Sequence, residues 1–341
     1  MLNTEAGAMV SVPWLRSCCL DSQTLVYILL FGLLAIVIYT KLRDEDVFFN
    51  PQGRAVLITG CDSGFGNLLA LRMLDMGFTV FAACLFPDGD GAQALINHSS
   101  PGQVKVIRLD VTSDEEVEKV KQYVKENLPD KGLWGLVNNA GISMWGMVEW
   151  LTIDKYQKVL NVNLLGSIRT TLAFAPLIRK NKGRMVFLSS TNAYISMLNS
   201  IYSMSKAGLE KFCDCLRLEM KKFGVQVCII EPGNYAPATN IQPFVDAEQI
   251  WDPLSAEVKE ICSKESIGSI TNFVREQLES GSRKSHEVVD AIIDALTSPS
   301  PKPRYLVARL VEQLTLYLYL WLPTSLFDQF LLFAVRKSGW S

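Results

Sequence analysis

The feature that most constrains the fold is an alternation, between residues 54 and 233, of short apolar runs with longer amphipathic stretches. The runs that read as strands cover residues 54–60, 78–85, 104–111, 132–141, 183–190 and 225–233. Helical periodicity fills the intervals, over residues 67–77, 113–128, 153–178 and 201–224. Strands that are apolar along their whole length are typical of parallel sheets, which are buried on both faces. The alternation therefore predicts an α/β protein with a doubly wound parallel sheet.

The composition suits such a domain and excludes other classes of protein. The 341 residues are 49% hydrophobic and 20% charged, which is enough to build a substantial core. The net charge is −2 and the sequence has no cluster of lysines and arginines, so it predicts no basic surface for binding nucleic acid. The eight cysteines form no C-x-x-C pair and no cysteine and histidine group at zinc spacing. We therefore expect reduced thiols, no metal site and no nucleic-acid partner.

The N-terminal region carries a candidate membrane anchor. Residues 25–39 are wholly apolar, and Thr24 and Thr40 extend the run to the lower limit of about 17 residues for crossing a bilayer. A signal peptide is the alternative, but no cleavage site of small residues follows the run. The sequence predicts an N-terminal segment (1–23), a single transmembrane helix (24–40) and a polar linker (41–53). Few arginines precede the run, which favours the endoplasmic reticulum over the mitochondrial inner membrane.

The main domain is expected over residues 54–303. From 234 to 284 the strand signals give way to polar helices interrupted by Pro237, Pro243 and Pro253, which indicates an insertion covering the ligand side. The C-terminal tail (304–341) is apolar and aromatic, with a break at Pro323. Such a tail either lies in a membrane interface or packs on the core or on a partner subunit.

A glycine-rich turn, "TGCDSGFG", joins the first predicted strand to the first predicted helix. Gly60, Gly64 and Gly66 allow the backbone to turn tightly and to approach a pyrophosphate at a helix N-terminus. This placement, at the start of a βαβ series, predicts a Rossmann-type nucleotide site.

The end of the second strand distinguishes NAD from NADP, because an acidic group there binds the ribose hydroxyl and a basic group binds the phosphate. Cys84 occupies that place, and residues 73–104 contain no lysine or arginine, whereas Asp88 and Asp90 lie nearby. The absence of cations favours NAD, with NADP less favoured.

The proton-transfer group is expected in "YSMSK". The chain has only two histidines, whereas Tyr202 and Lys206 lie four residues apart and share one face of a predicted helix. A free tyrosine has a pKa of about 10, and an adjacent ammonium together with a positively charged nicotinamide favours the phenolate and lowers that pKa. By itself the pair is weak evidence, because a tyrosine and a lysine at this spacing occur by chance in many chains. Tyr202 as the acid and base, with Lys206 supplying the positive charge, is an expectation that depends on the motifs around the pair.

Taken in order, these motifs resemble the short-chain dehydrogenase/reductase family. The matching stretches are the glycine turn, "LDVT" with Asp110, "NNAG" (138–141), "NVN" with Asn163, "LSS" (188–190), "YSMSK" and "EPG" (231–233). Within the family the chain looks most similar to the membrane-associated branch of D-β-hydroxybutyrate dehydrogenase, the retinol dehydrogenases and 17β-hydroxysteroid dehydrogenase type 2. The resemblance implies an NAD-dependent oxidoreductase, and family habit suggests a homo-oligomer.

The resemblance also implies roles for individual residues. Ser190 would bind the substrate oxygen, with Ser189 as the competing candidate, and Asn163 would support a water leading to Lys206, which also holds the nicotinamide ribose. The residues expected to bind the cofactor are Gly60, Asp62, Ser63, Gly64, Phe65, Gly66, Cys84, Asp110, Asn138, Ala140, Gly141, Tyr202, Lys206, Pro232 and Gly233.

The substrate is the most open question. Hydroxybutyrate enzymes of this family need a cation for the substrate carboxylate, but Asn199 stands at the expected place and residues 190–202 hold no positive charge. An unpaired carboxylate is costly to desolvate. Bulky residues flank the motifs and either line an apolar pocket or belong to the core: Met144, Trp145, Met147, Trp150, Met197, Leu198 and Tyr235. The sequence therefore favours a lipophilic alcohol or ketone, of steroid or retinoid type, with D-3-hydroxybutyrate as the alternative.

Two more distant alternatives come from other functional classes. Ser203 and Lys206 match the S-x-x-K pattern of serine acyl enzymes, but the other motifs of those enzymes are missing. The second alternative is a membrane-tethered NAD-binding protein without catalytic activity. The complete set of Tyr202, Lys206, Ser190 and Asn163 argues against this alternative.

Overall fold

The computed structural model describes residues 24, 27–28, 30–35, 49–239 and 241–336. The chain divides into two units, 1–48 and 49–341. In the first unit the described residues are helical, and the predicted anchor over 24–40 lies partly outside them. No helix among the described residues is long and apolar enough to cross a membrane.

The second unit is built on a parallel sheet with the strand order β3-β2-β1-β4-β5-β6-β7. The strands are β1 (Ala55–Thr59), β2 (Thr79–Cys84), β3 (Val104–Arg108), β4 (Leu133–Asn138), β5 (Arg184–Leu188), β6 (Gln226–Pro232) and β7 (Arg304–Val307). The order reverses between β1 and β4, and such a switch point leaves a crevice at the carboxyl ends of the strands. The predicted doubly wound sheet is confirmed.

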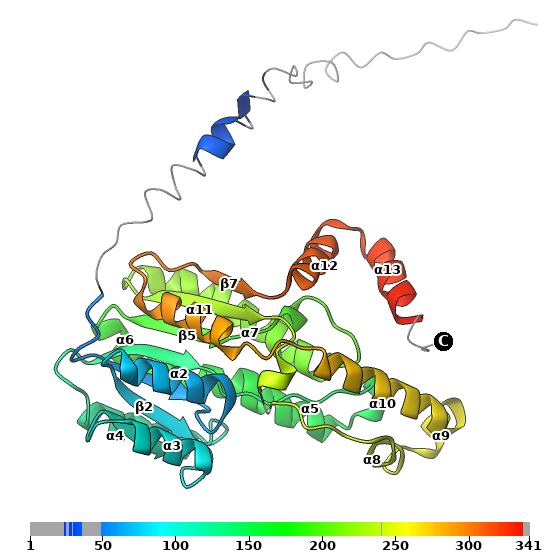
Figure 1. Cartoon of the computed structure of the whole chain (residues 1–341), viewed down its shortest axis with the longest axis horizontal. Helices are drawn as coiled ribbons and strands as arrows, with labels where there is room; N and C mark the ends of the chain where they lie inside the picture. The colour runs from blue at the N-terminus through cyan, green and yellow to red at the C-terminus, as the bar shows by residue number, and fades with distance from the viewer. Residues whose placement is uncertain (1–23, 25–26, 29, 36–48, 240, 337–341) are drawn as a thin grey trace, which may run out of the picture. The chain divides into compact units, whose positions relative to one another are not determined.

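Helices cover both faces of the sheet (Figure 1). One face packs against α2 (Gly64–Asp75), α3 (Asp90–His98) and α11 (Ser285–Thr297), and the other against α4 (Asp114–Glu126), α6 (Ser167–Lys180) and α7 (Ser200–Lys221). The side chains of β1 alternate between these two cores, because successive residues of a strand point to opposite faces.

Three elements of the sheet domain were not predicted from the sequence, namely α3, α11 and β7. β7 lies beyond the predicted domain boundary at residue 303 and adds a seventh strand. α3 and β7 are short, and β7 is only partly buried, so neither has a clear periodicity. α11 does bury one apolar face, but it follows the segment that was interpreted as an insertion.

The long helix predicted over 153–178 is interrupted. α5 (Ile153–Leu160) and α6 are separated by a π-helical segment, η3 (Asn161–Gly166). A π turn contains one residue more than an α turn, and hydrophobic periodicity does not reveal it.

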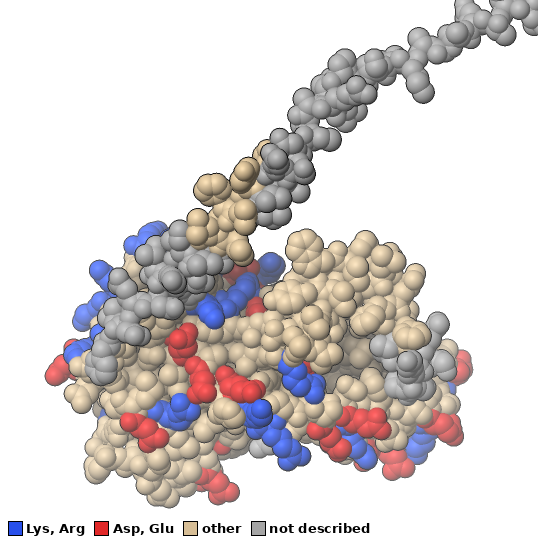
Figure 2. Space-filling model, turned by 45° about the horizontal axis from the view of Figure 1, so that its top comes forward, with Lys and Arg blue, Asp and Glu red and all other residues tan. Residues whose placement is uncertain are grey.

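The segment 234–284, predicted as an insertion, contains the short helices α8 (Ala247–Trp251) and α9 (Ala256–Ile261) and the longer α10 (Lys264–Glu279). In the tail, α12 (Leu310–Trp321) and α13 (Thr324–Arg336) flank Pro323. These two helices form the lobe in Figure 2 that is nearly free of charged side chains. Their exposed apolar residues include Leu310, Leu314, Tyr317, Trp321, Leu326 and Phe330.

Candidate active site

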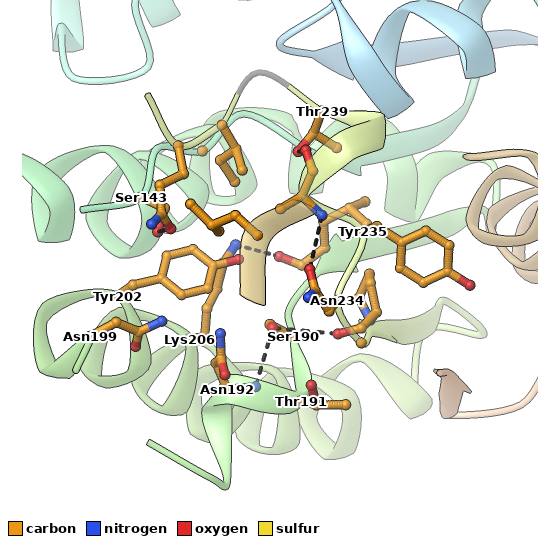
Figure 3. Close-up of a pocket in the computed structure, with 18 of the residues that line it drawn as sticks. Ser143, Ser190, Thr191, Asn192, Asn199, Tyr202, Lys206, Asn234, Tyr235 and Thr239 are labelled. Carbon is orange, nitrogen blue, oxygen red and sulfur yellow. Dashed lines mark hydrogen bonds between the residues drawn. The ribbon is translucent and has the colours of Figure 1, made fainter. Parts of the chain in front are cut away.

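A cavity of about 750 Å³ opens at the carboxyl ends of the strands. Its lining comes from the glycine turn after β1, the ends of β4, β5 and β6, the helix α7, and the helices α10 and α12. This volume is within the usual range for sites that bind small molecules. Figure 3 shows that Tyr202 and Lys206 both project into this space from α7, with Ser190 opposite them.

The glycine turn has the shape expected of an anion cradle. Gly60 and Gly64 adopt positive φ angles of 73° and 61°, which side chains rarely allow, and Gly64 begins α2. Gly66 packs against the turn, so that a Cβ there would lie 2.3 Å from the carbonyl oxygen of Gly60. The residues present therefore fit a dinucleotide whose pyrophosphate lies at the N-terminus of α2.

The ends of β1 and β4 are tied together beside this turn. The Thr59 hydroxyl accepts hydrogen bonds from the amides of Asn139 and Ala140, both at 3.0 Å. The Asn139 side chain donates to the carbonyl oxygens of Thr59, at 2.8 Å, and Gly60, at 3.0 Å. Asn139, which was not among the predicted residues, lines the cavity. The neighbouring Asn138 instead bonds Thr170 and Thr171 on α6.

The end of β2 carries a carboxylate from an unexpected element. Cys84 is fully buried, and the cavity is lined instead by Leu85 and Phe86. Asp62, from the glycine turn, accepts hydrogen bonds from the amides of Leu85 (3.0 Å) and Phe86 (2.7 Å). A side pocket beside it is lined by Asp62 and Asp90 and by no lysine or arginine of the described residues. This environment disfavours the extra phosphate of NADP.

Tyr202 and Lys206 lie together, and burial governs the pKa of each. Tyr202 is 9% exposed and Lys206 is 3% exposed. The Lys206 Nζ lies 5.5 Å from the centroid of the Tyr202 ring and donates a 2.7 Å hydrogen bond to the carbonyl oxygen of Leu188. Burial lowers the pKa of Lys206 to about 8, partly opposed by Glu210.

The predicted decrease in the pKa of Tyr202 is not what the protein alone produces. Burial raises the pKa of Tyr202 to about 12, while a hydrogen bond with Ser190 acts in the opposite direction. The physical reason is that the phenolate loses its hydration, and the one ammonium beside it is itself buried and bonded to a carbonyl. In the protein alone, Tyr202 is therefore an acid.

Of the two serines that end β5, Ser190 lies on the cavity side. Its hydroxyl accepts a hydrogen bond from the amide of Asn192 at 3.1 Å and donates a long one, 3.4 Å, to the carbonyl oxygen of Pro232. Ser189 also borders the cavity, but its hydroxyl is buried without a partner of good geometry among the described residues.

Asn163 lies in the π-helical segment and is completely buried. Its side-chain oxygen accepts from the amide of Ile142, and its side-chain nitrogen donates to the carbonyl oxygen of Ile142 and to Ser205, each at 2.9 Å. Asn163 thereby fixes the segment after "NNAG" against α7. The π turn contains the residue for which a site role is predicted, and π turns are frequent at functional sites.

Several predicted cofactor residues do not border the cavity: Gly66, Cys84, Asp110, Asn138 and, among the catalytic set, Asn163. Asp110 bonds the amide and hydroxyl of Thr112 instead, at 2.9 and 2.7 Å. These five support the elements that shape the site, and any direct contact with a ligand stays a prediction. The other predicted residues line the cavity, namely Gly60, Asp62, Ser63, Gly64, Phe65, Ala140, Gly141, Ser190, Tyr202, Lys206, Pro232 and Gly233.

The remaining wall of the cavity is largely apolar. Of the residues expected there, Trp145, Met197, Leu198 and Tyr235 line it, and Met144, Met147 and Trp150 do not. The insertion and the tail add residues that sequence reasoning missed: Phe273, Val274, Leu278, Val311 and Thr315. They come from α10 and α12, far along the chain from any motif.

Lys206 and Arg309 are the cations among the described lining residues. The Arg309 guanidinium pairs with Glu312 at 2.9 Å and donates to the carbonyl oxygen of Ser280 at 3.0 Å. Both cations of the lining are therefore already bonded within the protein.

Comparisons with known proteins agree with this geometry. A family profile described as short chain dehydrogenase matches residues 54–249. The chain is 41% identical to retinol dehydrogenase 7 of Mus musculus, over 77% of this chain and 83% of that protein. It is 41% identical to mitochondrial D-beta-hydroxybutyrate dehydrogenase of Rattus norvegicus, over 78% and 79%. It is also 41% identical to 17-beta-hydroxysteroid dehydrogenase type 6 of Bos taurus, over 85% and 91%.

The fold also resembles solved structures. A short-chain dehydrogenase/reductase of Burkholderia phymatum, crystallised in complex with NAD, superposes with a TM-score of 0.63 over 80% of this chain and 94% of that one, at 19% identity.

Proposed function

Because this chain belongs to the short-chain dehydrogenase family, we propose that it is an NAD-dependent oxidoreductase that interconverts an alcohol and a ketone or aldehyde. The observation that carries the proposal is the placement of Tyr202, Lys206 and Ser190 in one cavity with a glycine turn built for a dinucleotide. When bound, the nicotinamide supplies or accepts the hydride.

The chain's own residues would handle the proton. The Tyr202 hydroxyl donates a proton to the substrate oxygen in reduction and its phenolate accepts one in oxidation. The Ser190 hydroxyl orients the same oxygen. Lys206, as an ammonium, together with the positive charge of a bound nicotinamide would favour the phenolate of Tyr202 and so bring the reverse proton transfer closer to neutral pH.

The cavity wall favours a lipophilic substrate of steroid or retinoid type over D-3-hydroxybutyrate. Apolar side chains from α10 and α12 line the space, and the described cations of the cavity are already bonded within the protein. Bringing a carboxylate into this space would leave it unpaired, which is costly. D-3-hydroxybutyrate stays the alternative because of the identity to a hydroxybutyrate dehydrogenase.

Purified protein should oxidise a retinol or a 17-hydroxysteroid with NAD, and more slowly or not at all D-3-hydroxybutyrate. Replacing Tyr202 by phenylalanine should reduce turnover by about 10² to 10⁴-fold, the usual contribution of a positioned acid or base, while NADH binding persists. Unchanged turnover in Tyr202→Phe would reject the assignment. Faster oxidation of D-3-hydroxybutyrate than of both lipophilic alcohols would reverse the choice of substrate.

We further propose that the protein is membrane-bound, through residues 24–40 and with the lobe of α12 and α13 against the bilayer surface. Tyrosine and tryptophan side chains, such as Tyr317 and Trp321, favour headgroup depth and are exposed on α12. The full-length chain should remain with membranes after alkaline carbonate extraction. Release into the supernatant would exclude the anchor.

A further inference from the structure

Behind the proposed proton-transfer site lies a second layer of buried charge on the same helix. Glu210 follows Lys206 by one turn of α7, so Tyr202, Lys206 and Glu210 share one face. All three side chains are buried, and Glu210 is only 3% exposed. A buried carboxylate one turn from the key ammonium has no role in the chemistry described so far.

Glu210 is held in place by Arg304 of β7. The guanidinium pairs with the Glu210 Oε2 atom, with Glu231 at 2.7 Å and with Asp214 at 2.7 Å. It also donates to the hydroxyl of Tyr194 at 2.9 Å, and that hydroxyl donates to Glu231. One guanidinium thus faces three carboxylates, and the cluster stays negative before Lys206 is counted.

The second oxygen of Glu210 is unusual. Glu210 Oε1 is buried without a hydrogen-bond partner among the described residues, and so is the hydroxyl of Ser189. The two groups are nevertheless close enough for Ser189 to lower the pKa of Glu210, against the burial that raises it. Glu210 is therefore held between the Arg304 guanidinium on one side and the hydroxyl of Ser189, which borders the cavity, on the other.

The charged and titratable groups around Glu210 come from every neighbouring element. Besides Arg304, Glu231, Asp214 and Tyr194, they are Lys206 and Cys213 of α7. Asp214 is partly exposed and also contacts Lys211 and Arg217 at the surface. Glu210, followed by Cys213, opposes the burial that lowers the pKa of Lys206. The Lys206 Nζ itself bonds the carbonyl oxygen of Leu188 and lies over the ring of Tyr202.

We propose that Glu210 is a positioning residue for proton transfer, because its buried carboxylate, fixed by Arg304, keeps Lys206 cationic and thereby sets the pH at which Tyr202 accepts a proton. This inference rests on the proposed oxidoreductase function. In this view, the carboxylates around Arg304 control how the rate of alcohol oxidation depends on pH.

The test compares Glu210→Gln with Asp214→Asn in the full-length chain. Both variants remove a carboxylate that pairs with Arg304, but Asp214 lies two turns from Lys206 and at the surface. In Glu210→Gln the ascending limb of kcat against pH for alcohol oxidation should move up by about one unit, with a fall of up to about tenfold near pH 7 and little change in KM. In Asp214→Asn the limb should move by less than about 0.2 unit.

A second variant and a second readout keep the outcomes separate. Ser189→Ala, a small change, removes a donor from Glu210 and should move the limb in the same direction by less. A second readout does not depend on activity. The free energy of unfolding of each variant, measured with and without Lys206→Met over a range of pH, gives the pH at which Lys206 loses its proton. This pH should be lower in Glu210→Gln than in the wild type. An active enzyme with unshifted profiles in Glu210→Gln and Ser189→Ala overturns the inference. If Glu210→Gln does not fold, Ser189→Ala alone decides. A wild type without any alcohol oxidation overturns the proposed function instead.

Discussion

Replacing Lys206 by methionine should change how the stability of the protein depends on pH. Burial lowers the pKa of Lys206 from 10.5 in the unfolded chain to about 8 in the folded protein, with Glu210 opposing the decrease. Between these two values the unfolded chain binds a proton that the folded protein does not. Stability therefore rises with pH in this window, and the burial of the cation is most costly below pH 8.

The magnitude follows from the size of the shift. One pKa unit is about 1.4 kcal/mol, so the free energy of unfolding of the wild type, relative to Lys206→Met, should increase by about 2.5 kcal/mol between pH 7 and pH 10. Methionine also leaves the carbonyl oxygen of Leu188 without its donor, which costs about 1 to 3 kcal/mol. That cost does not depend on pH, so it shifts the whole curve and leaves the slope unchanged.

The assay is urea unfolding followed by tryptophan fluorescence at a series of pH values. The range should end near pH 10, because burial raises the pKa of Tyr202 to about 12 and reverses the trend at higher pH. Lys211→Met is the matched control, since Lys211 lies on the same helix with its side chain 86% exposed, and its curve should run parallel to the wild type. A difference between wild type and Lys206→Met that is independent of pH from 7 to 10 would refute the reasoning.

Two further predictions concern the cofactor site. Gly66→Ala should weaken NADH binding, because its Cβ would lie 2.3 Å from the Gly60 carbonyl oxygen and force the turn apart. Fluorescence titration measures the binding. Gly268→Ala is the control, because no atom lies within 4 Å of the Cβ added there. Binding equal to that of the wild type would contradict the cradle. Leu85→Arg places a cation at the end of β2, beside Asp62, and should improve kcat/KM with NADP relative to NAD by about tenfold or more, in line with the 1.5 to 3 kcal/mol of a charged hydrogen bond. An unchanged ratio would mean that the ribose lies elsewhere.

The sequence predicts those parts of this protein that depend on local pattern. Six strands and the glycine turn are visible because a continuous apolar run suits a strand buried on both faces, and because glycines at fixed places suit a tight turn. Helical spacing places Tyr202 and Lys206 on one face of α7, and the ordered motifs around them identify the pair as the site.

What the sequence could not predict depends on tertiary contacts. No sequence pattern predicts that Asp62 accepts hydrogen bonds from the amides at the end of β2. Likewise, none predicts that Arg304 of β7, a strand absent from the predicted sheet, pairs with Glu210. The raised pKa of Tyr202 has the same origin, because the extent of burial comes from the assembled site. The apolar wall supplied by α10 and α12 lies more than 60 residues from the nearest catalytic residue, Lys206, in sequence.

The π turn between α5 and α6 makes chain length part of the design of the site. Each residue of an α-helix advances the chain by about 100°, so removing one residue from 161–166 would turn every later side chain of α6 by that angle. Phe174 and Ile178 would then no longer pack in the core against the sheet, and the hydrogen bond between the amide of Ile142 and Asn163 would be lost. This helix should therefore tolerate a one-residue deletion less well than the turn at Gly102, which is exposed and where an added Cβ would meet no atom within 4 Å. In this segment the number of residues is as strictly constrained as their identity.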